Sequence, residues 1–240
     1  SNPMLNSRVA ENVMLDSKPM TVQGAITKTM ILLAIVVACA YYTWTLCAQG
    51  FADKAMLIMT VSLIAGFILA LITSFKPNVS KITAPAYALC EGLLVGAVSY
   101  SYAALYNGIV MQAVGITLAA LFMMLMLYKL RIIQATPTFR KVILISTGAI
   151  ALFYLVGIIG AFIGHPMTLF NGGITGIVVS VVFCGIAALN FVLDFDFIER
   201  GSENCLPDYF EWYGGFALLV TVIWLYFEVL KLLAQMNRRN

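Results

Sequence analysis

Charge is scarce in this 240-residue chain. Only 10% of the residues are Asp, Glu, Lys or Arg, whereas 62% are hydrophobic and the mean hydropathy is +0.95. Soluble domains carry roughly a quarter charged residues, and a soluble fold of this size could not cover so much apolar surface. The composition therefore excludes an ordinary soluble protein and predicts an integral membrane protein.

The residues that build metal and catalytic sites are also scarce. The single histidine, His165, lies in a loop beside Pro166, so no histidine-rich metal site can form. The five cysteines include no CxxC pair. An intramembrane aspartyl protease needs aspartates on two helices, and the last apolar stretch has none. We expect no enzymatic activity, no resident cofactor and no nucleic-acid partner.

Long apolar runs are what the chain has instead. A transmembrane helix needs about 20 apolar residues, and seven windows bounded by turn or charge signals qualify. They are residues 24–47, 55–75, 82–104, 109–130, 142–164, 172–195 and 213–236. Because the connections are short, we predict an all-α seven-transmembrane-helix bundle in one domain over residues 24–236. A polar N-terminal tail (1–23) and a short basic C-terminal tail (237–240) flank it.

The positions of Lys and Arg in the short loops predict the orientation. With the N-terminus inside, ten of the 14 Lys and Arg residues fall on the inner side and four on the outer. Two of those four, Arg238 and Arg239, oppose the rule, but we keep a full crossing of the last helix. The N-terminus is therefore expected to be cytoplasmic.

Small residues recur at the spacing that lets helices approach closely in lipid, as in the Gly92–Gly96 pair. Such a pair serves either packing inside one bundle or a dimer interface. We expect the first use, and hence a monomer or a weak dimer in the lipid bilayer.

Acidic side chains inside the apolar windows are the functional candidates, because a carboxylate in hydrocarbon is costly unless it is neutral, paired or wet. Glu91 lies nine residues into its window, roughly 13 Å and near the midplane. Glu228 lies in the outer third, where Lys231 three residues on can pair with it. A plain structural ion pair is the alternative for Glu228. Asp194 lies at the inner end of the sixth window, and Asp196 is at its border.

Asp194 and Asp196 are two residues apart, about 200° on a helix, so they point to opposite faces. Asn190, four residues before Asp194, shares its face and points inward with it. Asp196 shares its face with Arg200, and we expect it in a wet, charged rim. A helix-end carboxylate that reaches the interface is the alternative for both aspartates.

Several linked stretches carry a family resemblance. They are LNFVLDFDFIE, EWYGGFALLVTVIWLYFEVLKLL, AYALCEGLLVGAVS and YKLRIIQATPTFRKV. Over roughly residues 26–233 the chain resembles the Bax-inhibitor family (the transmembrane BAX inhibitor motif proteins), in its bacterial branch. The resemblance implies a seven-helix bundle with a central last helix, in a bacterial inner membrane.

The family's members are described as pH-sensitive calcium leak channels, and some as regulators of cell death or of membrane proteases. The leak pore pairs an aspartate near the end of the sixth helix with one on the last helix. By its place in LNFVLD, Asp194 matches the first aspartate, whereas Thr221 stands at the place of the second. The resemblance thus implies a gate or pH sensor at Asp194, with Asp196, Thr221 and Asn190 around it. A hydroxyl cannot share a proton as a carboxylate does, so the pH dependence should be shallow.

Two functions follow from these features. The first is a pH-sensitive leak channel or transporter for cations, most of all calcium, with Glu91 and Glu228 along the ion path. Carboxylates are the hard oxygen ligands that calcium needs, and it would bind only in transit. The second is a non-conducting regulator that binds other membrane proteins or proteases. Calcium flux in proteoliposomes separates the two.

Overall fold

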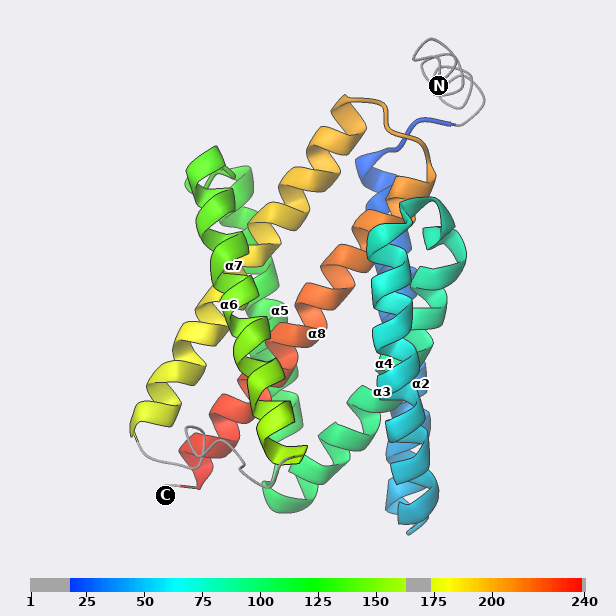
Figure 1. Ribbon diagram of the computed structural model, residues 1–240, viewed down its shortest axis with the longest axis vertical. Helices are drawn as coiled ribbons and strands as arrows, with labels where there is room; N and C mark the ends of the chain where they lie inside the picture. The colour runs from blue at the N-terminus through cyan, green and yellow to red at the C-terminus, as the bar shows by residue number, and fades with distance from the viewer. Residues whose placement is uncertain (1–17, 163–173, 239–240) are drawn as a thin grey trace. The chain divides into compact units, whose positions relative to one another are not determined.

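The computed structural model describes residues 18–162 and 174–238, which form seven long helices joined by short turns (Figure 1). Each of the seven is long and apolar enough to cross a membrane. They are α2 (Val22–Ala48), α3 (Ala52–Phe75), α4 (Ser80–Leu105), α5 (Ile109–Lys129), α6 (Pro137–Phe162), α7 (Ile174–Glu203) and α8 (Tyr209–Asn237), with a 3-10 turn, η1 (Pro77–Val79), before α4. The predicted seven-helix fold is confirmed; His165, most of the N-terminal tail and half of the C-terminal tail lie outside the described residues.

Local signals in the sequence explain where the helices begin. Thr21 precedes α2, and its hydroxyl accepts a hydrogen bond from Gly24 N at 2.9 Å. Pro137 opens α6, where a missing N–H costs nothing, and Phe139 N donates to the Thr136 hydroxyl at 3.2 Å. Gly108, with φ of 74°, forms the tight turn between α4 and α5.

Helix α7 is longer than the sequence predicted. The apolar window ended at Phe195, but the helix continues eight residues further to Glu203. Backbone hydrogen bonds do not need an apolar sequence, and the Asp196–Arg200 ion pair at 3.0 Å, one turn apart, supports the extension. Asp194 therefore lies nine residues, or about 13 Å, before the end of its helix rather than at the end.

Helix α8 is the most buried of the seven. In its most apolar window 61% of the residues are buried, compared with 11–39% in the other six helices. Leu219, Leu225 and Leu230 are at most 2% exposed. The predicted central last helix is confirmed, and at 29 residues α8 is about 43 Å long, enough for a full crossing.

The helices pack as two compact units. Among the described residues, the first unit holds those up to Val98 together with Asp196–Leu219. The second holds those from Ser99 to Phe195 together with those from Val220 onward. Helices α4, α7 and α8 contribute residues to both units, since each continues across a boundary.

In the first unit, α2, α3 and α4 lie side by side (Figure 1). The Gly92–Gly96 pair of α4 packs on the backbone of α2. A Cβ added at Gly92 would lie 2.7 Å from the Val36 carbonyl oxygen, and one at Gly96 would overlap the Ala40 carbonyl. This glycine pair is therefore used for packing within the chain, as expected.

One end of the first unit joins three segments that are far apart in the sequence. The start of α2, the start of α4 and the α7–α8 turn are connected by Met20 N to Leu206 O (2.6 Å), Thr21 Oγ1 to Glu211 Oε1 (2.9 Å), Ser80 Oγ to Tyr209 O (2.7 Å) and Lys81 Nζ to Asp208 Oδ2 (2.8 Å). All three segments were predicted on the inner side. Their meeting at one end agrees with an alternating path through the membrane.

Candidate functional site

In the second unit, a hydrogen bond links Asp194 of α7 to Thr221 of α8. The Thr221 hydroxyl donates to Asp194 Oδ2 at 2.6 Å. Thr221 is 6% exposed, Asp194 is half-buried, and the neighbouring Phe191 is completely buried. A bond to an ionised carboxylate is roughly twice as strong as a neutral one, and a weakly polar environment strengthens it further. The contact joins the two residues that the family resemblance indicated for the gate.

Asn190, one turn before Asp194, connects α7 to a different helix. Its amide nitrogen donates to the Thr147 hydroxyl of α6 at 2.9 Å and to the Ile186 carbonyl at 2.8 Å. The face of α7 that Asn190 and Asp194 were predicted to share is thus polar at both positions. Asn190, however, forms its hydrogen bond with α6, whereas Asp194 forms its hydrogen bond with α8. Thr147 was not identified from the sequence, because nothing local to Asn190 indicates its partner on another helix.

The prediction of a wet rim around Asp196 is wrong. Asp196 is 7% exposed, and its carboxylate pairs with Arg200, whose side chain is 57% exposed. Because α7 continues past Asp196, the carboxylate lies against packed helices rather than at a helix end. The long Arg200 side chain supplies the counter-charge and still reaches outward. Asp196 belongs to the first unit, so it is not part of the Asp194–Thr221 contact.

Glu91 lies in the middle of α4, also in the first unit. The side chain is half-buried and forms a hydrogen bond with Tyr87, one turn earlier. A Cβ added at Gly66 of α3 would lie 3.4 Å from Glu91 Oε1, so the carboxylate faces a helix surface without a side chain. Tyr87 itself is 5% exposed, and its ring packs edge-on against Phe216.

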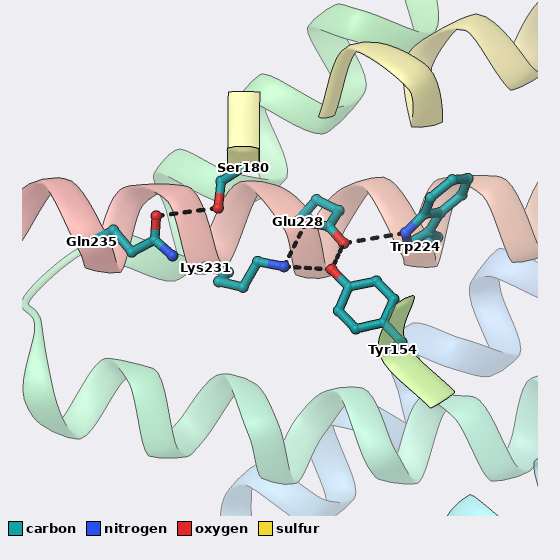
Figure 2. A network of polar contacts seen from close by, with 6 residues as sticks. All are labelled: Tyr154, Ser180, Trp224, Glu228, Lys231 and Gln235. Atoms are coloured by element: carbon teal, nitrogen blue, oxygen red, sulfur yellow. Dashed lines mark hydrogen bonds and ion pairs between the residues drawn. The ribbon is translucent and has the colours of Figure 1, made fainter. Parts of the chain in front are cut away.

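Glu228 is the centre of a polar cluster in the second unit (Figure 2). The predicted pair with Lys231 is confirmed, with Lys231 Nζ 2.8 Å from Glu228 Oε2. The other carboxylate oxygen accepts from the Tyr154 hydroxyl of α6 and from Trp224 Nε1 at 3.2 Å. Sequence reasoning missed both donors. Trp224 lies four residues before Glu228 and was detectable, whereas Tyr154 is on another helix and was not.

Metal binding among the described residues could use at most two of these side chains at a time. Within residues 18–162 and 174–238, no three His, Cys, Asp or Glu side chains come together to hold a metal ion. Calcium takes six to eight oxygen ligands. At any one of these positions most of them would have to be water or backbone carbonyls.

The comparison with known families covers almost the whole chain. The model of the Bax inhibitor 1 like family matches residues 2–238. The chain belongs to the Bax inhibitor 1 like family. This Bax inhibitor 1 like protein is thus an integral membrane protein, with seven apolar helices in contact with lipid. No curated protein matches the chain.

Proposed function

We propose that this Bax inhibitor 1 like protein is a leak pathway for cations, calcium foremost, which the Asp194–Thr221 hydrogen bond closes. The observation that supports the proposal is the 2.6 Å bond between α7 and α8. The family is associated with ion-leak activity, and this bond is at the position that the family resemblance indicates for the gate. The protein acts without a resident cofactor and without catalysis.

The proposed closure depends on charge. An ionised Asp194 accepts a charge-assisted bond from Thr221, which holds the two helices together. Protonation makes the bond neutral, which lowers its net contribution by about 1 kcal/mol. The balance of open and closed states then changes about fivefold, because 1.4 kcal/mol corresponds to a factor of ten. Acidification is therefore expected to increase the leak modestly.

Glu91 and Glu228 are proposed as oxygen ligands that a cation meets within the first and the second unit, respectively. For Glu91 we expect that Glu91→Gln keeps the fold and lowers calcium flux into proteoliposomes, because the amide keeps the shape but loses the charge that attracts the ion. The control is Asp53→Asn, which removes an exposed carboxylate from the first turn of α3.

Unchanged flux in a well-folded Glu91→Gln protein would remove Glu91 from the path. If the parent protein carries no more flux than empty liposomes, the regulatory function, in which the protein binds other membrane proteins, replaces the leak.

The proposed orientation has the N-terminus in the cytoplasm, in a bacterial inner membrane. In a variant without the native cysteines, a thiol at Asn107 in the α4–α5 turn is expected to react with an impermeant reagent added outside intact cells. A thiol at Thr136, just before α6, should react only after the cells are opened. Reaction at Thr136 from outside would reverse the topology. Thr168, a further outer position, lies outside the described residues.

A further inference from the structure

The Lys231 ammonium in the second unit contacts a carboxylate, a phenol oxygen and an aromatic ring (Figure 2 shows the polar contacts). Nζ lies 2.8 Å from Glu228 Oε2 and donates to the Tyr154 hydroxyl oxygen. It also lies over the ring of Phe183, 5.6 Å from its centroid, and 4.8 Å from the centroid of the Tyr154 ring on the hydroxyl side. One carboxylate, one phenol oxygen and one ring face from three helices thus form a cage, which we call the Glu228 cage.

The anionic side of the Glu228 cage is fixed. Glu228 is 2% exposed, and its Oε1 accepts from both the Tyr154 hydroxyl and Trp224 Nε1. These two donors orient the carboxylate so that Oε2 faces the ammonium. Two donors other than Lys231 thus hold the carboxylate at Oε1.

The cationic side is not fixed in the same way. The Lys231 side chain is 22% exposed and ends a flexible four-carbon stem. Helix α8 continues only six residues, about 9 Å, beyond Lys231. Lysines this close to the end of a membrane helix can extend their ammonium to the interface. Lys231 therefore has a second place for its charge, whereas Glu228 has none.

We propose that the Glu228 cage is a binding site for one monovalent cation of the ammonium type, which Lys231 occupies as a tethered ligand. Calcium would need six to eight oxygens, and the cage offers two together with the aromatic face of Phe183. An aromatic face beside a carboxylate suits weakly hydrated monovalent and organic ammonium ions. The tethered ammonium would also block ion passage through the second unit. This block rests on the proposed leak function, whereas the binding site itself does not.

The test replaces the tethered cation with a free one. Lys231→Ala removes the atoms of n-propylammonium, and the purified variant is melted with n-propylammonium chloride, with propanol, and with sodium chloride at equal ionic strength. We expect a lower melting temperature than the parent's, restored in part by n-propylammonium but not by propanol. Adding Glu228→Gln to the variant should abolish the restoration, because the cage then has no charge.

The matched control is Lys81→Ala. Lys81 forms an ion pair of the same length, 2.8 Å with Asp208, but the two side chains are 49% and 37% exposed, so this ammonium is open to solvent. n-Propylammonium should leave its melting temperature unchanged. Equal restoration of both variants, or none in a folded Lys231→Ala protein, overturns the site. If Lys231→Ala does not fold, Lys231→Met with ammonium chloride replaces it, and absence of stabilisation there overturns the site equally.

Measurements of ion flux test the leak function independently of the binding site. If Lys231 occupies the cage at least about 90% of the time, its removal should raise potassium leak about tenfold or more, since the open fraction limits the rate. n-Propylammonium should then reduce that leak. If n-propylammonium restores the melting temperature but no variant leaks, the binding site stands and the leak function is contradicted. Leak in the parent that Lys231→Ala leaves unchanged contradicts the block.

Discussion

Asp194→Asn is expected to raise calcium leak about fivefold at neutral pH, because a neutral amide accepts the Thr221 hydrogen bond about 1 kcal/mol more weakly than a carboxylate. The same change should flatten the dependence of leak on pH, because the group that responds to protonation is gone. The measurement is calcium flux into proteoliposomes between pH 5 and 8 for parent and variant.

Two comparisons sharpen this experiment. Asp196→Asn removes a carboxylate from the same helix two residues away, but that carboxylate pairs with Arg200, so leak should change little. Thr221→Val keeps the shape and deletes the donor, so it should raise leak at least as much as Asp194→Asn does. Because Thr221→Val already removes the bond that Asp194→Asn weakens, the double variant should leak no more than Thr221→Val alone. Additive effects, or parent-like leak of Asp194→Asn at every pH, would show that this bond is not the closure.

Thr221→Asp should give the largest change in pH response. The Thr221 hydroxyl lies 2.6 Å from the Asp194 carboxylate, so an aspartate there places two carboxyl groups within contact. Such a pair binds its protons in two coupled steps, and two like charges in contact repel. With one shared proton the helices stay joined. When that proton leaves, α7 and α8 separate and leak rises steeply.

The direction in which leak changes with pH distinguishes the Thr221→Asp variant from the parent. Parent leak should rise modestly as the pH falls, because protonation weakens the Asp194–Thr221 bond. Leak of Thr221→Asp should instead rise steeply as the pH increases, because the second deprotonation creates the repulsion. Thr221→Asn is the control, since it has the same shape and cannot ionise. Identical pH profiles for the Asp and Asn variants would exclude a coupled pair at this position.

The sequence by itself determined the features that depend on composition and on one helix at a time. Long apolar windows are set by the thickness of the bilayer, so seven helices and most of their boundaries could be predicted. Helical periodicity placed Lys231 beside Glu228 and Arg200 beside Asp196, because residues three or four apart share a face. The Asp194–Thr221 contact came from the family resemblance, which carries information about the fold that periodicity lacks.

Only the tertiary structure decided which helix each polar side chain meets. Tyr154 reaches Glu228 across 74 positions of sequence, and Thr147 reaches Asn190 across 43, so no local pattern could identify either contact. The burial of Asp196 was missed for a related reason. Hydropathy reports where a sequence stops being apolar, whereas a helix ends where its backbone hydrogen bonds end, and a carboxylate stays buried wherever packing and a counter-charge allow it.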